Sequence, residues 1–156
     1  MSCAEPSQLN LLVRSATDPL FCSAEARALA RRAGFAAPRA AALAIAVAEL
    51  ASNIVRHAKE GSVFLRLHQD PPEATMIEVV AADRGPGIAD LALAQQDGYS
   101  RGRFNAAALE RGEGLPPSLG CGLGAVRRLT DECEIESVPG RGTTVTVRLY
   151  LRGRTG

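Results

Sequence analysis

The pattern of apolar positions predicts two long helices in the first part of the chain. In the longer one, apolar side chains recur every three or four residues: Leu43, Val47, Leu50 and Ile54. This spacing puts them on one face, so a helix over residues 38–58 is predicted to bury that face and to end at Gly61. Before it, Asp18 as the N-cap predicts a helix over residues 18–32, which Gly34 ends.

Alternating apolar and polar positions predict five strands in the rest of the chain. They are expected over residues 9–14, 63–67, 77–82, 133–138 and 145–151. A short helix is predicted over residues 89–96 and another over 124–131. The segment 98–119 has no stable period and is predicted to be a mobile loop. Because the strands follow one another in pairs with short turns, we expect a mixed, mainly antiparallel sheet covered on one face by helices, an α+β sandwich of two layers.

Length and composition are typical of a soluble protein with one domain. The 156 residues suffice for one core, and 46% hydrophobic with 22% charged residues is ordinary for a globular chain. We expect residues 9–151 to form the domain, with tails at 1–8 and 152–156. The net charge of +1 gives no basic face for nucleic acid or an anionic membrane. We see no membrane span, no secretory signal and no metal-type cysteine spacing, which favours a cytoplasmic protein with free thiols.

The basic residues and the glycines restrict how this chain can bind a nucleotide. Lys59 is the only lysine, so the chain has no P-loop, because that motif needs a lysine directly after its glycines. Nine of the 15 glycines fall between Gly85 and Gly124. We therefore predict that this stretch provides close backbone approach or mobility, and that any nucleotide is held in another way.

Glu49 and Asn53 form the first candidate site. They lie four residues apart and share one helical face, about 100° around the helix from the apolar stripe. A carboxylate beside an amide oxygen suits a hard cation such as Mg²⁺ at the edge of a cleft. When the pair is taken alone, a solvated helix face is the alternative interpretation.

A second candidate site is the sequence Asp83-Arg84-Gly85-Pro86-Gly87-Ile88, which directly follows a predicted strand. An aspartate at the end of a strand can accept a hydrogen bond from an exocyclic amine of a ligand. Gly85 and Gly87 would let such a ligand lie against the backbone. The alternative interpretation is a tight turn that is capped by Asp83.

Two further glycine motifs follow near the C-terminus. The sequence Gly120-Cys121-Gly122-Leu123-Gly124 opens a predicted helix, where exposed amides and the helix dipole suit phosphates. It is not a dinucleotide-binding fingerprint, since no strand precedes it and the spacing G-x-G-x-x-G is absent. Gly142-Thr143 enters the last strand, and the hydroxyl of Thr143 could support the contact of Asp83. A hairpin turn is the alternative interpretation.

In their order and spacing, these four motifs resemble the N, G1, G2 and Gly-Thr boxes of the GHKL ATPase superfamily, whose ATP-binding domain has the Bergerat fold. Within it, residues 9–151 are similar to the RsbT-type switch serine/threonine kinases of the anti-sigma-factor branch. Residues 95–100, residues 127–137 and the Gly-Arg-Gly-Thr-Thr-Val-Thr run after them carry this likeness. Ser52, where the family usually has arginine, and the long stretch 101–117 depart from the family pattern.

The resemblance implies a role for each motif residue. Glu49 would be the general base toward the attacking hydroxyl, and Asn53 would hold Mg²⁺ against the phosphates of ATP. Asp83 would recognise the adenine amino group with help from Thr143. A lid is implied over about residues 97–119. The other nucleotide-binding residues implied are Gly85, Gly87, Ile88, Gly120, Gly122, Leu123 and Gly124.

The resemblance also implies a bacterial signalling role. The substrate would be a serine or threonine of a STAS-domain antagonist protein in a partner-switching pathway of stress response or sigma-factor control. A downstream phosphatase, cyclase or sigma-factor regulator is a further implied partner. Two alternatives stay open, an RsbW-type anti-sigma factor and a nucleotide-dependent protein that sequesters its partner without significant kinase activity. Glu49 favours catalysis, because binding alone needs no general base.

Overall fold

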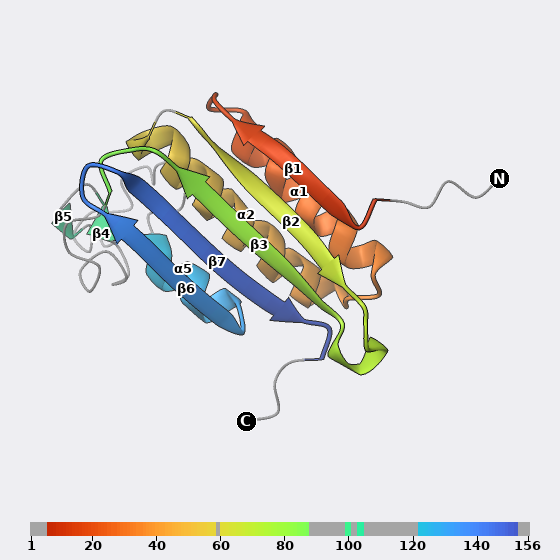
Figure 1. The fold of residues 1–156 in the computed structure, drawn as a ribbon. Helices are drawn as coiled ribbons and strands as arrows, with labels where there is room; N and C mark the ends of the chain where they lie inside the picture. The colour runs from red at the N-terminus through yellow and green to blue at the C-terminus, as the bar shows by residue number, and fades with distance from the viewer. Residues whose placement is uncertain (1–5, 59, 88–98, 101–102, 105–121, 153–156) are drawn as a thin grey trace.

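The protein is a five-stranded sheet with helices on one face, as seen in a computed structural model (Figure 1). The structure describes residues 6–58, 60–87, 99–100, 103–104 and 122–152. The sheet has the order β1-β2-β3-β7-β6, and every neighbouring pair is antiparallel. Its strands are β1 (Gln8–Val13), β2 (Gly61–His68), β3 (Met76–Asp83), β6 (Glu132–Val138) and β7 (Gly142–Tyr150). The α+β class is confirmed, and the sheet is wholly antiparallel in the described part.

The helices of the described part form the second layer, with α2 at its centre. They are α1 (Asp18–Arg32), α2 (Ala37–His57) and α5 (Gly122–Leu129), and a short 3₁₀ helix, η1 (Pro72–Ala74), joins β2 to β3. The helix α2 packs against α1, α5 and the strands β2 and β3. Its predicted apolar stripe is buried, with each of the four side chains at most 2% exposed. The core therefore lies between α2 and the middle of the sheet.

The apolar character of α2 requires one correction. Contrary to the expectation from the sequence, this helix is long and apolar enough to cross a membrane by length and composition. A core helix passes the same test, and more than half of its apolar window is buried inside the domain. We therefore interpret α2 as the core helix of the domain.

Three polar or glycine positions mark the element ends, and two of them differ from the prediction. Asp18 is the first residue of α1, not its N-cap, and its Oδ2 accepts hydrogen bonds from the N–H groups of Arg14 and Ser15. Gly61 begins β2 and does not end α2. The position requires glycine, because a Cβ there would lie 2.5 Å from the carbonyl oxygen of Ala82. Gly34 follows α1 with φ +92°, as predicted.

Parts of the chain between β3 and α5 lie outside the described residues. Within the stretch predicted as a loop, β4 (Tyr99–Ser100) and β5 (Arg103–Phe104) form a small antiparallel ladder. The helix predicted over residues 89–96 lies outside the described part. Cys22 and Cys133 are free thiols, in agreement with the prediction, and burial raises the pKa of the Cys22 thiol to about 11.

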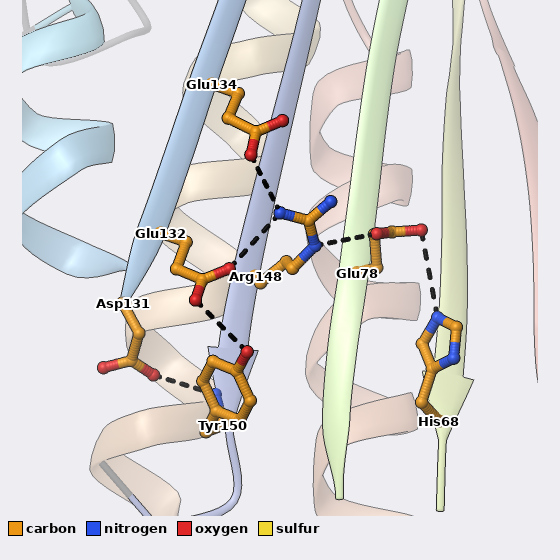
Figure 2. A network of polar contacts seen from close by, with 7 residues as sticks. All are labelled: His68, Glu78, Asp131, Glu132, Glu134, Arg148 and Tyr150. Carbon is orange, nitrogen blue, oxygen red and sulfur yellow. Dashed lines mark hydrogen bonds and ion pairs between the residues drawn. The ribbon is translucent and has the colours of Figure 1, made fainter. Parts of the chain in front are cut away.

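The helix-free face of the sheet carries a polar network centred on Arg148 (Figure 2). Its guanidinium donates to Glu78 at 2.9 Å, and to Glu132 and Glu134 at 3.2 Å each. Tyr150 donates its hydroxyl to Glu132 at 3.2 Å. Asp83 and Thr143 lie on the opposite, helix-covered face of the sheet.

Candidate functional site

Four register partners form a row across one end of the sheet. Gly61, Asp83, Thr143 and Ser137 follow one another across β2, β3, β7 and β6. Side chains along a strand point alternately to the two faces of the sheet. Ala81 and Val145, two residues from Asp83 and Thr143, are buried under the helices. The side chains of the row therefore face the helices as well. The C-terminal half of α2 covers this end, because a Cβ on Gly61 would lie 2.9 Å from Cγ2 of Ile54.

Asp83 is held in place by main-chain donors. Its Oδ1 accepts hydrogen bonds from the N–H of Gly85 at 2.8 Å and from the N–H of Thr143 at 3.3 Å. The hydroxyl of Thr143, which the sequence offered as the support for Asp83, lies instead 2.9 Å from Oγ of Ser137. Asp83 thus caps its own turn with one oxygen. Ser137, the partner of the Thr143 hydroxyl, is a residue that sequence reasoning missed.

The glycines of this turn are required by the packing of the chain itself. A Cβ on Gly85 would lie 2.7 Å from Cβ of Ala58, which directly follows α2. Gly87 has φ +75°, and a Cβ there would lie 2.6 Å from the carbonyl oxygen of Val138. The turn after β3 is therefore clamped between the end of α2 and the end of β6. Ile88, which was also predicted to bind the nucleotide, lies outside the described residues.

Glu49 is a buried carboxyl group on α2. It is 2% exposed, and its Oε2 has no hydrogen-bond partner within the described part of the chain. Burial raises the pKa of Glu49 to about 7, and the nearby charge of Arg56 lowers it in part. A solvated helix face is therefore the wrong interpretation of this position. A carboxyl with a pKa near 7 can accept or release a proton at physiological pH.

Asn53 lies one turn after Glu49 and is half-buried. Its amide Oδ1 accepts a hydrogen bond from Nη2 of Arg56 at 2.8 Å. Sequence reasoning missed this hydrogen bond. The spacing of three residues on one helix was the signal that could have found this contact.

The helix α5 begins at Gly122, two residues before the predicted start. Gly122 has φ +56°, while Leu123 is 5% exposed and Gly124 is buried. The helix packs against α2, so its first turn belongs to the same helical layer as Glu49 and Asn53. Gly120 lies outside the described residues.

The residues present fit a magnesium nucleotide. Within the described ranges, no group of three histidine, cysteine or acidic side chains could hold a metal ion. Mg²⁺ bound to a nucleotide needs no such cluster, because phosphates and waters supply most of its oxygen ligands. The amide oxygen of Asn53 is a donor of the required kind, and the unpartnered oxygen of Glu49 lies on the same helix face.

Known proteins resemble this chain over most of its length. The sequence profile of the histidine kinase-like ATPase domain family matches residues 21–149. The serine/threonine-protein kinase RsbT of Bacillus subtilis (strain 168) is 32% identical over 126 residues, which are 81% of this chain and 84% of that protein.

A solved structure gives the same fold. The crystal structure of the RsbU and RsbW domains of Rv1364c from Mycobacterium tuberculosis superposes on 93% of this chain with a TM-score of 0.60 and 18% identity. This chain spans 32% of that longer protein, so the likeness concerns the fold. Fold, family profile and sequence identity agree: the chain belongs to the histidine kinase-like ATPase domain family and, within it, to the ATP-binding serine/threonine-protein kinases of the RsbT type.

Proposed function

We propose that this protein is a Mg-ATP-dependent kinase that phosphorylates a serine or threonine of a STAS-domain antagonist protein. The reaction would switch partners in a cytoplasmic pathway of bacterial stress or sigma-factor control. The proposed catalytic domain spans residues 9–151, with a lid over about residues 97–119 and tails at 1–8 and 152–156. The similarity to a serine/threonine kinase over most of the chain supports this class of reaction.

The buried carboxylate of Glu49 is the observation that carries the proposal. Its unpartnered Oε2 can take the proton of the substrate hydroxyl while the hydroxyl oxygen attacks the γ-phosphorus of ATP. The bond between the γ-phosphorus and its bridging oxygen breaks, and ADP leaves. A carboxyl with a pKa near 7 is matched to this task at cellular pH. Asn53 would hold Mg²⁺, and the metal would supply positive charge to neutralise the phosphates.

The nucleotide would lie between the end of β3 and the helices. Asp83 would accept a hydrogen bond from the adenine amino group, and the main chain of Thr143 supports its orientation. The glycines at 85 and 87 would allow the turn after β3 to pack closely against Ala58 and Val138 and so keep Asp83 in position beside the base. The backbone around Gly120, Gly122, Leu123 and Gly124 would bind the phosphates through amides, in place of a P-loop lysine. Ile88 would complete the base site.

Transfer of labelled phosphate to a purified STAS-domain protein of the same organism tests the proposal. The wild type should phosphorylate this protein in the presence of ATP and Mg²⁺. Glu49→Ala should lose at least about 100-fold in transfer and keep its affinity for ATP, because a general base contributes about 10²–10⁴-fold. Asn53→Ala should lose the Mg²⁺-dependent part of ATP binding.

Glu60→Ala is the matched control, since Glu60 is an exposed glutamate close to the same end of the sheet. It should transfer phosphate like the wild type. Full transfer by Glu49→Ala would contradict the role of the base. Capture of a sigma factor or of the STAS-domain protein without any transfer would favour an anti-sigma factor or a sequestering protein over a kinase.

A further inference from the structure

Arg56 occupies the oxygen to which the proposed function assigns Mg²⁺. Its Nη2 donates to Oδ1 of Asn53 at 2.8 Å, and both side chains are half-buried. A hydrogen bond from a charged donor is short and strong, and partial burial strengthens it further. We propose that Arg56 is a latch on the metal site, which competes with Mg²⁺ for Asn53 and must release this oxygen before the metal nucleotide binds.

The two cations exclude one another at this position. Asn53 offers one neutral amide oxygen, and Mg²⁺ requires its ligands at about 2.0–2.1 Å in near-octahedral order. A guanidinium on the same oxygen would place a second positive charge next to the metal. The neutral amide brings no negative charge that could compensate for this repulsion. Mg²⁺ binding at Asn53 therefore requires the Arg56 side chain to move.

The helix provides a negative charge for the released guanidinium. Glu49 lies seven residues, or two turns, before Arg56, and thus on the same face of α2. The charge of Arg56 already lowers the pKa of Glu49, so the two groups are close enough to interact. The released guanidinium can therefore stay near the negative charge of Glu49 on the same helix face, and it need not contact Oε2, the oxygen to which the proposed function assigns the substrate proton.

The latch predicts how much Mg²⁺ the enzyme needs in order to bind ATP. In Arg56→Met, which keeps the length of the side chain and removes the donor, the half-saturating Mg²⁺ concentration should fall about 3- to 10-fold. ATP binding in the presence of a chelator should change less. The measurement is calorimetric titration of ATP at a series of Mg²⁺ concentrations, with no need for phosphoryl transfer.

Arg66→Met is the matched control, because Arg66 is an exposed arginine on the helix-free face of β2. It should leave the Mg²⁺ requirement unchanged. The effect of Arg56→Met should also persist at high ionic strength, because a direct contact is screened less than a long-range field. An unchanged or higher Mg²⁺ requirement in Arg56→Met overturns the latch, and so does a fall that Arg66→Met shares or that salt abolishes.

The inference rests on the proposed role of Asn53, and Asn53→Ala tests that role separately. If Asn53→Ala still binds ATP with the Mg²⁺ dependence of the wild type, the metal assignment of the proposed function fails. If Asn53→Ala loses this Mg²⁺ dependence and Arg56→Met does not lower the half-saturating Mg²⁺ concentration, the metal assignment stands and only the latch is wrong. Thermal melts of both variants verify that each one is folded.

Discussion

The main-chain N–H of Thr143 donates to Oδ1 of Asp83 at 3.3 Å across the ladder between β3 and β7, while the hydroxyl of Thr143 lies 2.9 Å from Ser137. The support of Asp83 therefore does not depend on the side chain of Thr143. Any residue other than proline at position 143 supplies the same N–H donor. The orientation of Asp83 is therefore set by a main-chain donor of β7. The hydroxyl pair of Thr143 and Ser137 is a separate contact between β7 and β6.

Substitutions at these positions should separate the two contacts. Thr143→Ala should weaken ATP binding by less than about 3-fold, because the N–H donor to Asp83 remains. Asp83→Asn should weaken it by about 10- to 100-fold, since it removes the charged acceptor for the adenine amino group. Calorimetric titration with ATP measures both, and Ser137→Ala is the control for the hydroxyl pair. A larger loss in Thr143→Ala than in Asp83→Asn would contradict this arrangement.

Gly85→Ala should destabilise the fold through a steric collision. The new Cβ would lie 2.7 Å from Cβ of Ala58 and 2.9 Å from its Cα, so the end of α2 would have to shift. Overpacking of this kind costs about 1–3 kcal/mol of unfolding free energy. Adding Ala58→Gly should restore part of the loss, because it removes the nearer of the two atoms. Urea unfolding measures the effect, and an unchanged midpoint in Gly85→Ala would show that the contact is loose.

The sequence predicted those features that local periodicity controls. The apolar stripe of α2 and the alternation of the strands follow from side chains only a few residues apart, so the layers and the antiparallel pairing could be derived. The shared face of Glu49 and Asn53 follows from helical geometry in the same way.

Features that depend on packing between distant segments could not be derived. Thr143 is the register partner of both Asp83 and Ser137, and its side-chain orientation in the assembled sheet brings the hydroxyl to Ser137. Gly61 was expected to end a helix, but it begins β2, where it pairs with Val13 and Asp83. The burial of Glu49 likewise depends on the assembled helical layer, so its raised pKa could not be predicted from spacing.

Phosphoryl transfer is expected to increase with pH up to neutrality. Burial raises the pKa of Glu49 from its ordinary value of 4.5 to about 7, against the opposing charge of Arg56. Only the deprotonated carboxylate can take the hydroxyl proton, so kcat should fall about tenfold per pH unit below the pKa. Transfer at saturating Mg-ATP, measured from about pH 5.5 to about pH 9, gives this profile. A flat profile across neutrality would exclude Glu49 as the base.

The same burial should make the folded state less stable as the pH rises from about 4.5 to about 7. A raised pKa means that the folded protein binds the proton of Glu49 more tightly than the unfolded chain does, so deprotonation favours unfolding in this window. Glu49→Gln should therefore raise the unfolding free energy at pH 8 by up to about 3 kcal/mol, and change it little at pH 4. Urea unfolding at both pH values measures this difference. Glu60→Gln, at an exposed position, should show no comparable difference.

Arg148→Met should destabilise the sheet without affecting the nucleotide site. It would leave Glu78, Glu132 and Glu134 facing one another on the helix-free face with their shared cation removed (Figure 2). The Arg148 side chain is 24% exposed, so we expect a loss of about 1–3 kcal/mol in unfolding free energy, between the values of exposed and buried ion pairs. The loss should shrink at high salt and near pH 4, where the repulsion is screened or the glutamates are protonated.

Arg66→Met, at an exposed position on the same face, provides the comparison and should cost less than about 0.5 kcal/mol. ATP affinity should be unchanged in both variants, because the network and the candidate site lie on opposite faces of the sheet. Urea unfolding at low and high salt, together with one ATP titration, distinguishes the outcomes. An equal loss in both variants would mean that the three-glutamate arrangement adds nothing beyond the removal of one surface charge. A loss of ATP affinity in Arg148→Met alone would mean that the helix-free face is coupled to the nucleotide site through β3 or β7.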